Sequence, residues 1–81
     1  MGYRDEVRER IIAEGINKTP AYVVQKMDGY RKTAAINYRL YKNADTLEQG
    51  QSYYVCSQNA YAKADAWQEV LEMLIHRISG R

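Results

Sequence analysis

The chain has 81 residues and a formal net charge of +2, and 46% of its residues are hydrophobic. This size and composition exclude a disordered chain and are typical of one small soluble domain over residues 1–81. A single cysteine, Cys56, excludes an intramolecular disulfide, and no apolar run is long enough to cross a membrane. We therefore expect a cytoplasmic protein that does not associate with a membrane.

Residues 3–14 are predicted to form an amphipathic helix. Tyr3, Val7 and Ile11 follow one another at four-residue intervals, and charged side chains occupy most positions between them. Gly15 is expected to end this helix as the C′ glycine of a Schellman-type cap, and a loop over residues 17–20 follows.

The middle of the chain is predicted to form three strands. Residues 21–27 are rich in β-branched and aromatic side chains, and Asp28-Gly29 is a strong hairpin signal. Residues 30–43 alternate between apolar and polar side chains, and residues 52–57 make a third strand after a longer turn around Gly50. Sequential hairpins predict an antiparallel sheet.

A long helix is predicted to close the domain, with Asn59 or Ser57 as its N-cap and Gly80 at its end. Its apolar side chains recur at three-to-four spacing: Ala60, Ala64, Trp67, Leu71, Leu74 and Ile78. The expected fold class is α+β, a two-layer sandwich of a three-stranded antiparallel sheet with two helices on one face, in the order α-β-β-β-α.

Tyrosine and positive charge gather in this predicted sheet. The chain has eight tyrosines and no phenylalanine, and residues 18–43 carry six basic side chains against one acidic side chain. Tyrosine and arginine are enriched at binding hot spots, so the outer face of the sheet is the candidate binding site rather than a plain solvated face. Its predicted binding residues are Tyr22, Lys26, Arg31, Arg39, Tyr41 and Tyr53.

Signatures of catalysis are absent from the sequence. It has no glycine-rich nucleotide loop and no cluster of metal ligands, because Cys56 and His76 are its only soft ligands and belong to different predicted elements. We therefore expect no enzyme activity, no cofactor and no metal. A ribonuclease built from Tyr, Arg and Lys is a distant third hypothesis, since no strand carries a general base.

The predicted element order resembles that of double-stranded RNA-binding domains. That family binds RNA through a Gly-Pro-x-His loop and a lysine cluster at the start of its last helix, whereas residues 27–30 read Met-Asp-Gly-Tyr and the last helix opens with Lys63 alone. The layout is also similar to some small phage anti-CRISPR proteins, which inhibit a nuclease by occupying its nucleic-acid or partner site. Both resemblances concern topology and not motifs.

These observations favour a non-catalytic binding protein. The first hypothesis is a small inhibitor or adaptor of phage or mobile-element type that docks on a larger protein, as the anti-CRISPR resemblance implies. The alternative is a nucleic-acid-binding domain, whose basic hairpin would contact phosphates while tyrosines stack on bases. A homodimer is compatible with either hypothesis.

Overall fold

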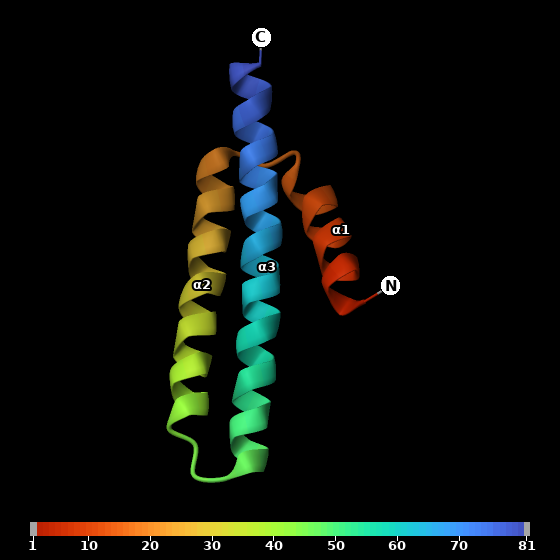
Figure 1. Cartoon of the computed structure of the whole chain (residues 1–81). Coiled ribbons are helices and arrows are strands. Elements are labelled where there is room, and N and C mark those ends of the chain that lie inside the picture. The colour runs from red at the N-terminus through yellow and green to blue at the C-terminus, as the bar shows by residue number, and fades with distance from the viewer. Residues whose placement is uncertain (1, 81) are drawn as a thin grey trace.

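A computed structural model describes residues 2–80 and forms three α-helices over that range: α1 (Tyr3–Gly15), α2 (Pro20–Lys42) and α3 (Leu47–Ser79) (Figure 1). The predicted α+β fold is therefore wrong, because no strand occurs between residues 2 and 80. The α-β-β-β-α order fails with it, and so does the resemblance to double-stranded RNA-binding domains and to anti-CRISPR proteins, which rested on that order.

Residues 20–42 form one helix because their packed positions recur at helical spacing. The buried or half-buried positions on this side of α2 follow one another at alternating steps of four and three residues: Val23, Met27, Tyr30, Ala34 and Asn37. That 3.5-residue period is the seam of a coiled coil, and it overrides the strand propensity of the valines and tyrosines. Asp28 and Gly29 lie inside the helix, where Asp28 pairs with Lys32 at 3.1 Å across one turn.

The same period continues in α3, which runs antiparallel to α2. Its buried or half-buried positions on this seam are Gly50, Tyr53, Ser57, Ala60, Ala64, Trp67, Leu71 and Leu74. The predicted third strand and the predicted N-cap at Asn59 are therefore wrong, because both lie within this helix. Trp67, which belongs to the apolar stripe predicted for the closing helix, is 2% exposed and therefore lies in the core.

Side-chain caps mark where the two long helices begin. The Thr19 hydroxyl accepts a hydrogen bond from the Tyr22 N–H at 3.2 Å, and Pro20 occupies the first helical turn, where its missing N–H costs nothing. Thr46 accepts from the Gln49 N–H at 3.2 Å in the same way. Pro20 therefore starts a helix, whereas the sequence placed it at the end of a loop before a strand.

The first predicted helix is confirmed, but its predicted cap is wrong. No residue from 2 to 80 has a positive φ, and Gly15 is the last residue of α1 rather than a left-handed cap. A Cβ atom at Gly15 would lie 2.7 Å from Cζ3 of Trp67 and 2.8 Å from Cγ1 of Val70. Glycine is thus required here because α1 and α3 approach each other closely.

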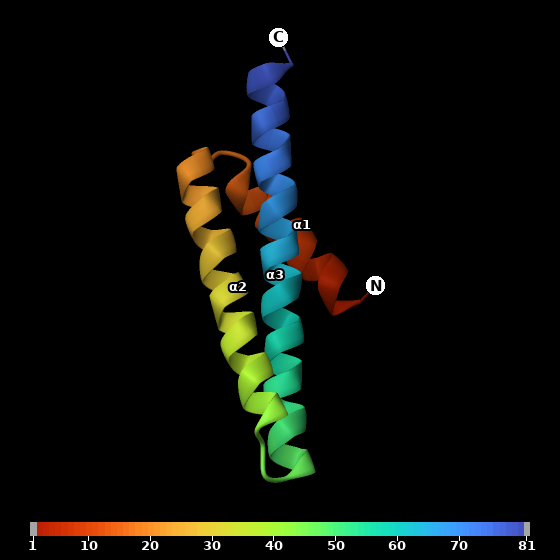
Figure 2. The ribbon, with the colours of Figure 1, turned by 60° about the vertical axis from the view of Figure 1, so that its left-hand side comes forward.

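The three helices lie almost in one layer. α3 is in the middle with α2 on one side and α1 on the other, and the molecule measures 53 × 27 × 15 Å (Figures 1 and 2). Its radius of gyration is 14.8 Å, against roughly 12 Å for a compact domain of this length. None of the helices between residues 2 and 80 combines the length and the apolarity needed to cross a membrane.

The layer has two unequal halves. We call α1 together with residues 20–34 and 60–79 the proximal half, and residues 35–59 the distal half. The proximal half contains the main core cluster, which consists of Ile11, Val23, Ala66, Trp67, Val70 and Leu74. The distal half contains only the end of α2, the connecting loop and the start of α3, so two helices there face each other without a third.

Candidate functional site

One broad side of the layer carries a row of exposed apolar and aromatic side chains, which we call the open face. On α2 its positions recur every seven residues at Val24, Arg31 and Tyr38, and Tyr41 joins them near the end of the helix. On α3 the same seven-residue spacing gives Leu47, Tyr54, Tyr61, Gln68 and Ile75. Because seven residues make almost two full turns, each set lies along one flank of its helix.

α1 leaves the open face uncovered. The residues of α3 around which α1 packs include Ala62, Ala66, Glu69 and Val70, which lie on a different flank of that helix. Six of the open-face side chains are between 37% and 50% exposed, and Leu47 is 90% exposed. The guanidinium of Arg31 donates to the amide oxygen of Gln68, so that this pair ties α2 to α3 at the centre of the face.

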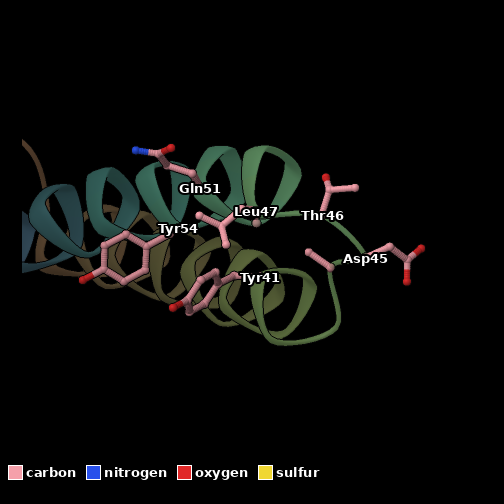
Figure 3. Close-up of a pocket in the computed structure, with 8 residues that line it drawn as sticks. Tyr41, Asp45, Thr46, Leu47, Gln51 and Tyr54 are labelled. Carbon is pink, nitrogen blue, oxygen red and sulfur yellow. The ribbon is translucent and has the colours of Figure 1, made fainter.

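The distal end of the open face contains a cluster of three tyrosines. The ring centroid of Tyr41 lies 5.7 Å from that of Tyr38 and 5.1 Å from that of Tyr54, in tilted geometries that aromatic pairs favour. Tyr41, Tyr54 and Leu47 border an open groove of about 610 Å³ beside the loop between the helices (Figure 3). This groove is the largest concavity described among residues 2–80, and its walls are mainly apolar.

The opposite broad side of the layer is more basic. Lys18 and Lys26 place their ammonium groups 5.3 and 5.6 Å from the ring centroid of Tyr22, and Lys63 lies 5.4 Å from that of Tyr30. These are cation–π distances. One such pair also flanks the open face, where Lys42 lies 5.5 Å from the ring of Tyr38.

Two ion pairs hold α1 against α3. Nε and Nη2 of Arg8 donate to the two carboxylate oxygens of Glu69 at 2.7 and 3.0 Å, and Arg4 lies 3.7 Å from Asp65. The hydrogen bond from Arg8 lowers the pKa of the Glu69 carboxyl and outweighs the opposing effect of burial. The same contact raises the pKa of Arg8, so each partner stabilises the charged form of the other.

The six binding residues predicted from the sequence do not share one surface. Tyr22 and Lys26 lie on the basic side, Arg31 and Tyr41 belong to the open face, and Arg39 is exposed on α2. Tyr53 is half-buried on the seam between α2 and α3. Strand alternation grouped these residues, but a helix of 3.6 residues per turn distributes them around its circumference.

Sequence reasoning missed most of the open face. Tyr54, Tyr61, Gln68 and Ile75 were not candidates, although their seven-residue spacing is visible in the sequence. The signal that could have found them is the flanking stripe of a heptad repeat, which becomes readable only once both helices are assigned.

The structure brings together few groups that could do chemistry. No group of three or more potential metal ligands gathers in the part of the chain that is described, residues 2–80. Cys56 and His76 both lie on α3, not on different elements as the sequence suggested, and twenty residues of helix separate them by roughly 30 Å. Cys56 is exposed.

Comparison with known proteins gives no match to a family model, to a curated protein or to a solved structure.

Proposed function

We propose that this chain is a non-catalytic binding protein that docks on a larger protein through the open face. The observation that carries the proposal is the single layer of helices with apolar and aromatic side chains on its uncovered side. Stable domains usually bury such a side against a second layer. A partner would supply that layer.

The accessible area supports a partner of ordinary size. The chain exposes 5892 Å², whereas a compact monomer of 9.4 kDa exposes roughly 5000 Å². The excess is similar to the ~800 Å² that one protein contributes to a standard interface. The flat shape of the molecule thus leaves exposed an extra area about as large as one partner's share of a standard interface.

The chemistry of the open face also favours protein over solvent. Its exposed tyrosines combine a rigid apolar ring with a hydroxyl, and such side chains recur as hot spots. The repeat of seven along both α2 and α3 places these side chains in two rows on neighbouring helices, an arrangement against which a third helix can pack. We therefore expect the partner to present a helix with apolar side chains.

The same proposal includes a cytoplasmic location for the protein. Cys56 is exposed and is the single cysteine of the chain, and an exposed unpaired thiol persists most readily in a reducing compartment.

Photo-crosslinking combined with paired variants tests the proposal. A photoreactive amino acid at position 61 should capture one partner in the native cell. Tyr54→Lys with Tyr61→Lys should abolish that capture from a crosslinker at position 68 and should weaken the purified complex at least tenfold. The reason is that two charges would be buried in an apolar contact.

Ile36→Lys with Val55→Lys is the matched control. Both side chains are exposed and apolar but lie outside the open face, so the double variant adds the same charge and should leave binding unchanged. Equal loss in both double variants would contradict the assignment of the face. Capture of a second copy of the chain, seen as a dimer in sedimentation, would contradict docking on a larger protein.

Nucleic-acid binding is the second candidate, and the lysine–tyrosine pairs around Tyr22 and Tyr30 favour it. This candidate predicts binding to single-stranded RNA or DNA that weakens steeply with salt, because each phosphate contact releases counterions. Lys26→Glu should abolish that binding, while Tyr54→Lys should not weaken it. Absence of an electrophoretic shift at 50 mM salt would reject the candidate.

A further inference from the structure

The open face lies between two outer edges of the hairpin. On either helix, a step of four residues leads from a buried seam position to the open face, and a second step of four leads to the outer edge. On α3 these steps connect Ser57, Tyr61 and Asp65, of which the first is buried and the other two are exposed. A helix that docks on the open face would therefore have one such edge along each of its flanks.

The edge on α3 is acidic. We call it the α3 edge, and its exposed side chains recur every seven residues at Gln51, Gln58, Asp65 and Glu72. Asp65 lies 3.7 Å from Arg4, but both side chains are more than 60% exposed, so this pair neutralises the carboxylate only weakly. No ion pair between residues 2 and 80 includes Glu72, whose carboxylate accepts a hydrogen bond from the Gln68 amide at 3.4 Å. The α3 edge thus offers two carboxylates to a partner.

The edge on α2 is basic. We call it the α2 edge, and its exposed side chains are Asp28, Lys32, Ala35, Arg39 and Lys42. Asp28 and Lys32 pair with each other at 3.1 Å, whereas neither Arg39 nor Lys42 has a carboxylate within 4 Å among residues 2–80. The ammonium group of Lys42 lies 5.5 Å from the ring centroid of Tyr38, so this charge directly borders the open face.

We propose, on the basis of the proposed docking on the open face, that the partner helix has a split charge pattern. Its acidic side chains lie along the α2 edge, and its basic side chains lie along the α3 edge. A helix packed between two others presents its flanks to them, as the e and g positions of coiled coils do. Opposite charges at such positions select the partner and its orientation.

Charge also discriminates among helices that would all pack against the same apolar rows. A helix with acidic side chains on both flanks would place like charges beside Asp65 and Glu72. A helix with basic side chains on both flanks would do so beside Arg39 and Lys42. Such repulsion against wrong partners is a common source of specificity. The split pattern is the arrangement that avoids repulsion at both edges.

Two synthetic helical peptides of the same composition test this pattern. Each has about 21 residues in three heptads, with leucine at the two apolar positions of each heptad. The split peptide carries glutamate on one flank and lysine on the other, whereas the alternating peptide mixes the same residues on both flanks. At about 50 mM salt the split peptide should bind at least fivefold more tightly in fluorescence anisotropy, because several ion pairs form together. The difference should shrink at about 500 mM salt, which screens exposed charges.

Paired charge reversals on the full-length chain locate the effect. Asp65→Lys with Glu72→Lys should remove the advantage of the split peptide and leave the affinity of the alternating peptide within about twofold. Glu6→Lys with Glu9→Lys is the matched control, because both side chains are exposed on α1, away from the open face. It adds the same charge and should retain the fivefold advantage.

Each contrary result has a distinct meaning. Equal binding of the two peptides at about 50 mM salt would overturn the split pattern and leave the docking of a helix intact. Absence of binding by either peptide up to about 1 mM, or binding that persists in Tyr54→Lys with Tyr61→Lys, would contradict the docking itself. A dimer in sedimentation that Asp65→Lys with Glu72→Lys disperses would make a second copy of the chain the occupant and would overturn the proposal.

Discussion

The proximal and distal halves are built on one seam but are stabilised by different side chains. The proximal half buries the large residues Trp67, Val70 and Leu74 against α1 and α2. In the distal half the fully buried positions are the small residues Gly50 and Ser57. The buried hydroxyl of Ser57 donates to the carbonyl oxygen of Ala34, the last residue of the proximal part of α2, at 2.9 Å. A regular heptad spacing therefore fixes which side of a helix is packed, but not how much apolar area is buried there.

The proximal and distal halves therefore have different roles. Folding free energy scales with the apolar area removed from water, so most of it arises in the proximal half. The distal half leaves Tyr38, Tyr41 and Tyr54 exposed at a place where few core contacts depend on them. Side chains there can serve a partner without weakening the core.

The largest expected effect separates the halves directly. Trp67→Ala should lower the free energy of unfolding by about 3–5 kcal/mol, because it leaves a cavity among three helices. Tyr53→Ala, at a half-buried seam position of the distal half, should lower it by less than half as much. Urea denaturation followed by circular dichroism measures both. Equal losses would show that the two halves contribute equally to the core.

Glycine substitutions give the next largest contrast. Gly15→Ala should destabilise the protein by about 1–3 kcal/mol, because the new Cβ would overlap Trp67 and Val70. Gly29→Ala is the matched control, since no atom lies within 4 Å of its Cβ position in the middle of α2. There the gain in helix propensity should stabilise the chain by up to about 1 kcal/mol. Thermal unfolding shows whether the signs are opposite.

Ser57→Ala should change the stability by less than about 1 kcal/mol. The variant loses one buried hydrogen bond to Ala34, but alanine is a better helix former than serine. Denaturation midpoints with an unchanged slope would measure this balance. A loss above 2 kcal/mol would mean that the distal half depends on this bond for its packing.

The smallest effect concerns the ion pair between α1 and α3. Because Arg8 lowers the pKa of Glu69 in the folded chain, the pair adds stability at pH values above the usual carboxyl value of 4.5. That contribution is lost as the pH falls below 4.5 toward the lowered pKa of the folded state. Wild type should therefore melt slightly above Glu69→Gln at pH 7, and the difference should vanish in acid. Glu72→Gln is the control, since the Glu72 carboxylate accepts from Gln68 on its own helix. It should leave the melting temperature at pH 7 close to that of wild type.

The two terminal helical regions could be predicted from the sequence because their apolar side chains recur at helical spacing and their residue types do not favour strands. Residues 3–14 match α1 closely, and the apolar stripe from Ala60 to Leu74 does face a packed neighbour. The neighbour is α2 rather than a sheet. Periodicity locates a buried face, but it does not identify what covers that face.

The prediction of strands in the middle of the chain was wrong because local propensity and tertiary packing favour different structures there. Tyr, Val, Ile and Thr favour strands locally, and Asp28-Gly29 favours a hairpin, but the seam from Val23 to Asn37 needs a continuous helix. The sequence also contains two signals for helix N-termini, which the strand propensity and the hairpin signal outweighed. Thr19-Pro20 is an N-cap followed by an N1 proline, and Thr46 with Gln49 has the spacing of a capping box.

The candidate site was predictable only in part. The abundance of tyrosine correctly indicated exposed aromatic side chains, and Tyr41 does belong to the open face. Its neighbours could not be identified from the sequence. Successive side chains are about 180° apart in a strand but about 100° apart in a helix, so a wrong element type places each residue on the wrong flank.

The regular repeat also makes the length of the hairpin modular. Since each heptad of α2 faces one heptad of α3, removing seven residues from each helix next to the loop would bring the ends together again in the same rotational phase. The shortened chain would keep the three-helix end while losing the tyrosine cluster. The distance between the three-helix end and the far tip is thus set by the number of heptads in the hairpin.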